Sequence, residues 1–107
     1  KNFPTNQILL GNGSDEVLDL IFRAFCEPNQ DNVIAISPSY GMYGVLANLN
    51  AIEYRKSLLN EEDFQPNIED IFSKIDNNTK MIFLCSPNNP TGEIIKKDSI
   101  LQIVSMV

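Results

Sequence analysis

The chain has 107 residues, enough for one domain, and 43% of them are hydrophobic, which is usual for a globular protein. Its net charge of −6, with only eight Lys plus Arg, disfavours nucleic acid and anionic membrane surfaces as partners. The absence of histidine excludes Ser-His and Cys-His catalytic pairs and His-containing metal sites, and the two isolated cysteines indicate reduced thiols in a cytoplasmic protein without a zinc or dithiol site.

The first half of the chain predicts alternating strands and helices. The short apolar run 7–10 stops at a glycine, and we expect it to be a strand. Apolar residues at helical spacing predict a helix over residues 14–26. The β-branched run 33–36 is typical of a strand that is covered on both faces. A second helical stripe follows over residues 40–49, and residues 51–56 are predicted to form a short strand.

The second half continues the alternation. Residues 58–66 are acidic and polar, which indicates a surface loop. Apolar residues at helical spacing then predict a helix over 68–75, with Asn67 as its N-terminal cap. The apolar run 80–85 is predicted to be a strand, and a last helix is expected from about Lys97.

This alternation predicts an α/β fold with three layers, in which a mainly parallel sheet lies between two layers of helices. Ligands of such folds bind at the carboxyl ends of the strands. The chain begins at Lys1 instead of Met, and the helical spacing continues to Val107 without a capping residue. We therefore expect the chain to be part of a longer protein.

A polar loop at residues 11–16 follows the first predicted strand and leads directly into a helix. The backbone N–H groups of Ser14, Asp15 and Glu16 are then unpaired donors at the positive end of that helix, which suits a phosphate group. The alternative is a simple turn whose acidic residues serve the helix dipole. The loop lacks the Gly-Lys-Ser/Thr ending of a P-loop and the third glycine of a dinucleotide fingerprint, which disfavours ATP and NAD.

Two further polar loops follow predicted strands. In the loop 37–43, Tyr40 is placed to lie flat against a planar ligand, or alternatively to be a core ring. In the loop 86–92, Asn89 precedes Pro90 and offers a donor and an acceptor to a ligand oxygen. The alternative for Asn89 is to close its own turn. Loops at the ends of parallel strands suggest one shared site.

The three loop sequences GNGSDE (11–16), SPSYGMY (37–43) and SPNNPTG (86–92) together resemble the fold-type I pyridoxal-phosphate-dependent aminotransferases. The string RAFCEP at residues 23–28 and the string YGMY are most similar to the histidinol-phosphate aminotransferase family. The resemblance covers nearly the whole chain, with the motifs in the same order. The Asn-Pro-Thr-Gly string supports the superfamily, whereas the other strings favour the narrower family.

The resemblance implies a role for each candidate residue. Backbone groups of Ser14, Asp15 and Glu16 would bind the phosphate of the cofactor pyridoxal phosphate, Tyr40 would stack on its pyridine ring, and Asn89 would bond to the ring hydroxyl oxygen. The implied reaction moves the amino group of histidinol phosphate to 2-oxoglutarate, giving glutamate, as a step of histidine biosynthesis. The full-length parent is expected to be a homodimer.

The chain also departs from the family pattern. In the family, the Schiff-base lysine, the aspartate that pairs with the pyridine nitrogen, a further tyrosine and the carboxylate-binding arginine all follow the Asn-Pro-Thr-Gly strand, and their motifs are not present here. Lys80, Lys96 and Lys97 lack the surrounding pattern, so no catalytic residue is assigned. Residues 1–107 are therefore expected to be the N-terminal part of the large, cofactor-binding domain and to be inactive alone.

Other interpretations remain open. Within the same superfamily, another aminotransferase or an enzyme of the threonine-phosphate decarboxylase type has similar motifs. From a different class, a non-catalytic α/β domain would hold a phosphorylated metabolite at residues 13–16, with Tyr40 and Asn89 purely structural. In the family the first strand pairs with a strand further along, so residues 7–10 would be left unpaired and would favour association with another chain.

Overall fold

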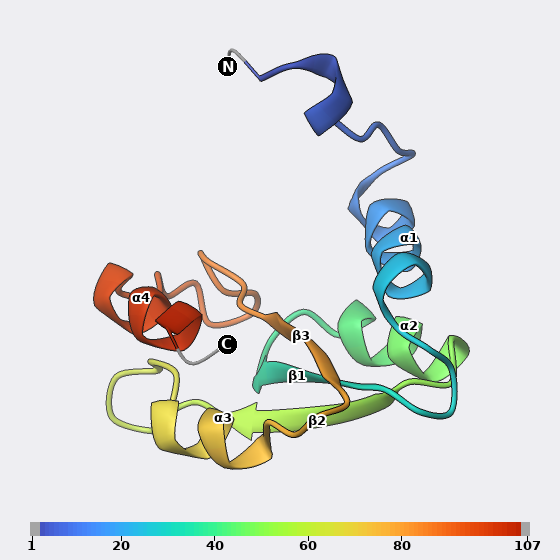
Figure 1. The fold of residues 1–107 in the computed structure, drawn as a ribbon. Helices are drawn as coiled ribbons and strands as arrows, with labels where there is room; N and C mark the ends of the chain where they lie inside the picture. Colours follow the sequence, from blue (N-terminus) through green and yellow to red (C-terminus); the bar gives the residue numbers. More distant parts are fainter. Residues whose placement is uncertain (1–2, 106–107) are drawn as a thin grey trace.

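The computed structural model describes residues 3–105. Within them, a short 3-10 helix, η1 (Thr5–Gln7), precedes an alternation of helices and strands (Figure 1). In chain order these are α1 (Ser14–Phe25), β1 (Asn32–Ser37), α2 (Met42–Leu49), β2 (Glu53–Leu58), α3 (Ile68–Lys74), β3 (Thr79–Phe83) and α4 (Lys97–Ser105). The end of the predicted last helix at Val107 lies outside the described residues.

The strands form a parallel sheet in the order β2-β1-β3. The central strand β1 is the continuous β-branched run, and its residues 33–36 are at most 1% exposed. A strand of this composition is stable only where both faces are covered, which explains its central place. The predicted α/β fold with a parallel sheet is confirmed.

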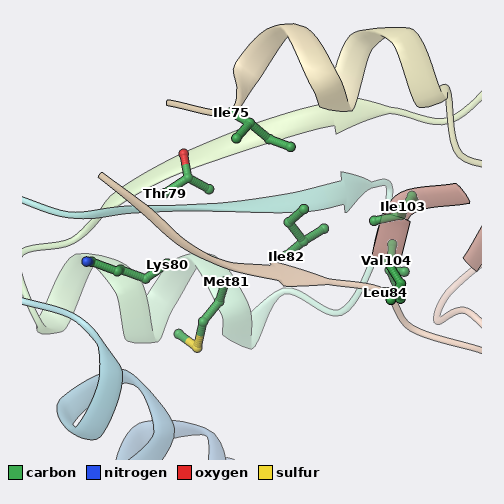
Figure 2. Close-up of a pocket in the computed structure, with 8 residues that line it drawn as sticks. All are labelled: Ile75, Thr79, Lys80, Met81, Ile82, Leu84, Ile103 and Val104. Atoms are coloured by element: carbon green, nitrogen blue, oxygen red, sulfur yellow. The ribbon is translucent and has the colours of Figure 1, made fainter. Parts of the chain in front are cut away.

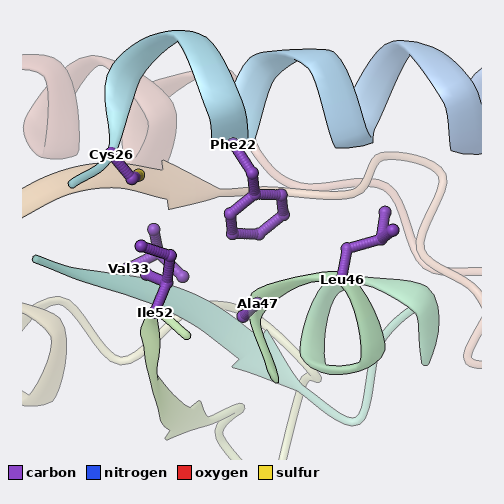
Figure 3. Close-up of a cluster of buried hydrophobic side chains, with 6 residues drawn as sticks. All are labelled: Phe22, Cys26, Val33, Leu46, Ala47 and Ile52. Carbon is purple, nitrogen blue, oxygen red and sulfur yellow. The ribbon is translucent and has the colours of Figure 1, made fainter. Parts of the chain in front are cut away.

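Helices cover both faces of the sheet and produce two cores. Figure 3 shows the first core, in which side chains of α1, of α2 and of the residues that follow each helix pack against one face of β1: Phe22, Cys26, Val33, Leu46, Ala47 and Ile52. The second core joins the opposite face to α3 and α4: Ile36, Leu59, Ile71, Ile95 and Ile103. Successive residues of β1 point to opposite faces, so one strand serves both cores. The three-layer arrangement is confirmed.

Most element boundaries agree with the sequence pattern. Asn67 caps α3 as predicted, since its side-chain oxygen accepts a hydrogen bond from the backbone N–H of Asp70 at 3.1 Å. Strand β2 begins at Glu53, two residues later than predicted. The delay arises because Ala51 has a positive φ of 57° in the turn after α2, and Ile52 is buried in the first core before the strand begins.

The prediction of a strand at residues 7–10 is wrong. Gln7 ends the 3-10 helix η1, and the structure assigns no strand to residues 8–10. A strand needs a neighbour for its backbone N–H and C=O groups, and none pairs with this segment among the described residues. The segment is exposed, with Leu10 at 87%.

Candidate functional site

The loops after β1 and β3 lie together because these strands are parallel neighbours. Asn88 fastens the two loops to each other. Its Nδ2 donates to the carbonyl oxygen of Pro38 at 2.7 Å and to Oγ1 of Thr91 at 3.1 Å, and its Oδ1 accepts from the Ser39 hydroxyl at 2.8 Å. Asn88 is 4% exposed, so these hydrogen bonds satisfy the polar atoms of a buried side-chain amide.

Tyr40 connects the loop after β1 to the start of α1. Its hydroxyl donates to Oδ1 of Asp15 at 2.6 Å, and this hydrogen bond raises the pKa of the Tyr40 hydroxyl above its usual value. The Tyr40 ring contacts the Tyr43 ring edge to face, with 5.7 Å between the ring centroids. The Tyr43 ring in turn stacks on the Phe83 ring, with 4.6 Å between the centroids. The aromatic contacts therefore fix the Tyr40 ring against the core.

The first turn of α1 presents free backbone donors. Gly13 is the N-terminal cap of α1 and has a φ of 86°. It has no side chain that could accept a hydrogen bond from the N–H groups of the first turn. Within the described residues, the backbone N–H groups of Ser14, Asp15 and Glu16 donate to no protein acceptor. The Glu16 carboxylate is turned back, since it accepts from the backbone N–H and the side-chain amide of Asn12 at 3.1 and 3.3 Å.

An open hollow of about 610 Å³ lies beside this helix end. Both Ser14 and Tyr40 line it, so two of the sequence-predicted loops meet at its wall. Its volume falls in the range of small-molecule sites. The other lining residues are aliphatic side chains, glycines, a tyrosine and a cysteine, and no acidic residue is among them within the described chain: Leu9, Leu10, Gly11, Gly13, Val17, Leu18, Tyr43 and Cys85.

The predicted site residues are not all in one place. Ser14, Asp15, Glu16 and Tyr40 lie around the start of α1, whereas Asn89 is exposed and does not line the hollow. The residue that sequence reasoning missed is Asn88. The string Ser-Pro-Asn-Asn-Pro signals a rigid loop, yet its pattern does not tell which of two adjacent asparagines turns inward.

A second cavity of about 240 Å³ lies between β3 and α4 (Figure 2). Ile82 and Leu84 of the β3 segment meet Ile103 and Val104 of α4 there, and the wall is largely apolar. Lys80 lines this cavity near the amino end of β3, whereas the three loops gather near the carboxyl ends. The structure therefore does not bring Lys80 to the hollow beside α1.

Residues 3–105 contain neither a cluster of metal-ligating side chains nor a membrane-spanning helix. No group of three or more His, Cys, Asp or Glu side chains lies close enough to hold a metal ion in that range. None of the helices within it is both long and apolar enough to cross a membrane.

Comparison with known proteins links these motifs to one family. The family model described as aminotransferase class I and II matches residues 1–107. The chain is 62% identical to a histidinol-phosphate aminotransferase of Flavobacterium johnsoniae over 103 residues, which are 96% of this chain and 29% of that protein. It is 56% identical to the same-named protein of Bacteroides fragilis over 98 residues, 92% of this chain and 28% of that protein. The chain thus spans less than a third of these curated relatives.

Solved structures agree on the fold. The histidinol-phosphate aminotransferase from Clostridium acetobutylicum matches with a TM-score of 0.77 and 31% identity, over 92% of this chain and 27% of that one. Cystalysin from Treponema denticola, a structure that contains pyridoxal 5'-phosphate, matches with a TM-score of 0.89 and 27% identity, over 98% of this chain and 27% of that one.

Proposed function

Because the chain belongs to the class I and II aminotransferase family, we propose that it is the N-terminal part of the cofactor-binding large domain of a histidinol-phosphate aminotransferase. The complete cytoplasmic, homodimeric protein would use pyridoxal phosphate to transfer the amino group of histidinol phosphate to 2-oxoglutarate in histidine biosynthesis. The identity of 62% over nearly the whole chain is the observation that carries this proposal.

The residues around α1 fit the phosphate of that cofactor. Ser14, Asp15 and Glu16 offer backbone N–H groups without protein acceptors at the positive end of a 12-residue helix. Each hydrogen bond to a charged phosphate is worth about 1.5–3 kcal/mol, so the three donors can hold the group without a lysine in the loop. A net stabilisation of this size needs these N–H groups to be free of the neighbouring carboxylates. Among the described residues, the Glu16 carboxylate accepts from Asn12 and the Asp15 carboxylate from Tyr40 instead.

The remaining candidate residues would orient the cofactor ring. Tyr40 lies on the wall of the hollow and is proposed to stack on the pyridine ring, which contributes about 0.5–1.5 kcal/mol beyond burial. Asn89 is proposed to bond to the ring hydroxyl oxygen. When bound, pyridoxal phosphate supplies an electron-accepting ring and an aldehyde that carries the amino group. No lysine of this chain is assigned a role, so residues 1–107 alone are expected to be inactive.

Absorbance spectroscopy of the complete protein tests this function. Adding pyridoxal phosphate should produce the visible band of the bound cofactor, and histidinol phosphate should then remove that band while 2-oxoglutarate restores it. A band that responds only to another amino donor would retain the family and reject the substrate. A protein that binds no pyridoxal phosphate would contradict the proposal.

A further inference from the structure

The start of α1 combines backbone N–H groups that can donate hydrogen bonds to an anion with two negatively charged side chains. Asp15 and Glu16 are both exposed and directly follow Ser14, whose N–H is one of the free donors. The loop 11–16 holds no lysine or arginine to offset these charges. A carboxylate that turned toward the donors would repel a phosphate and would also compete for the same N–H groups. The direction of each carboxylate therefore decides whether this helix end accepts an anion.

The two carboxylates are held by different means. Glu16 is bound inside its own loop by Asn12. Asp15 is bound by Tyr40, which is 25 positions away in the sequence and belongs to another loop. Among the described residues, the Tyr40 hydroxyl is the one group that donates a hydrogen bond to the Asp15 side chain. Its ring is itself fixed by the edge contact with Tyr43.

We propose that the Tyr40 hydroxyl is a positioning group that holds the Asp15 carboxylate away from the N–H donors of α1, so that this helix end accepts a phosphate dianion. The proposal rests on the proposed function for the identity of the anion, which is the phosphate of pyridoxal phosphate. Tyr40 then serves the site twice, because its ring lines the hollow and its hydroxyl controls a charge at the edge of that hollow.

A double-mutant cycle on the complete protein tests the proposal, with dissociation constants for pyridoxal phosphate and for inorganic phosphate measured by calorimetry. Tyr40→Phe retains the ring and releases Asp15, and it should weaken binding about tenfold, as expected for one charge-assisted hydrogen bond. Asp15→Asn removes the charge and should not weaken binding. In the double variant the penalty of Tyr40→Phe should disappear. Asp15→Ala provides a second neutral variant if Asp15→Asn does not fold.

The matched control is Tyr43→Phe, which removes a hydroxyl from the wall of the same hollow without releasing Asp15. Its effect should be the same with Asp or Asn at position 15. The inference is overturned if Tyr40→Phe has no effect, or if its penalty is equally large in the Asp15→Asn background. Those results leave the proposed function intact. An unmodified protein that binds neither ligand overturns the proposed function and this inference together.

Discussion

At the scale of single residues, the two adjacent asparagines Asn88 and Asn89 have different roles. Asn88 is buried and makes its bonds to protein groups, whereas Asn89 is exposed and is proposed to contact the cofactor. Asn88→Asp keeps the size of the side chain but removes both N–H donors and buries a charge. It should lower the free energy of unfolding of the complete protein by about 2–4 kcal/mol in a urea titration.

Asn89→Ala is the matched control for that prediction. It should change the free energy of unfolding by less than about 0.5 kcal/mol, because the side chain is exposed and makes no hydrogen bond within residues 3–105, while weakening the binding of pyridoxal phosphate. Equal losses of stability in the two variants would show that the assignment of inward and outward asparagines is wrong.

Asp76 gives a prediction about acid stability. Hydrogen bonds from the Asn32 side chain and the Asn78 backbone, with the Arg55 guanidinium at 2.9 Å, lower the pKa of Asp76 to about 2. An unfolded Asp has a pKa of about 3.9, so this carboxylate stabilises the folded chain above pH 4 and loses that contribution as the pH falls toward 2. In urea titrations, Asp76→Asn should show a shallower loss of stability between pH 4 and 2. Parallel curves would contradict this assignment.

Some of these single-residue roles can be predicted from the sequence, and others cannot. Asn67 is recognisable as a cap because a polar side chain directly before an apolar helical pattern has one local use. The hydrogen bond between Tyr40 and Asp15 could not be predicted from the sequence, since it joins two loops that only the folded sheet brings together. The placement of Asn88 was also beyond reach, because it depends on Pro38 and Ser39 in a distant loop.

At the scale of elements, α1 holds the proposed phosphate donors in place through one buried ring. Phe22 is fully buried, and its ring centroid lies 5.4 Å from that of Phe83 of β3. Phe22→Ala should lower the free energy of unfolding by about 3–5 kcal/mol and should weaken phosphate binding as well, because the helix start loses its support. Unfolding by urea, followed by circular dichroism, measures the first effect and calorimetry the second.

Phe25→Ala is the control for this element, since Phe25 is the last residue of the same helix and is 65% exposed. This substitution should lower the free energy of unfolding by less than about 0.5 kcal/mol. A similar cost at both positions would mean that α1 does not pack through Phe22 as described.

The helices were predictable because each has an apolar stripe at a spacing of three to four residues, which needs no knowledge of the partner. Strands depend on their neighbours. The run 33–36 became a strand because β2 and β3 pair with it, whereas the equally apolar segment 8–10 has no partner within the described residues and stays irregular.

At the scale of the whole molecule, the sheet formed by residues 3–105 has two unpaired edges, and considerable apolar surface is exposed. Strands β2 and β3 are each paired on one side, and Leu10, Leu49 and Leu58 are 87%, 75% and 69% exposed. Such edges and patches favour association. The 107-residue chain alone should therefore show a molar mass that rises with concentration in light scattering, and a constant monomer mass at high concentration would contradict this.

The most direct test of the proposed site is a crystal structure of the complete protein with pyridoxal phosphate bound. The distances from the phosphate oxygens to the backbone nitrogens of Ser14, Asp15 and Glu16 should be about 2.7–3.2 Å, with the Asp15 carboxylate still bound to the Tyr40 hydroxyl. A phosphate group that binds elsewhere, leaving these three N–H groups without it, would contradict the account.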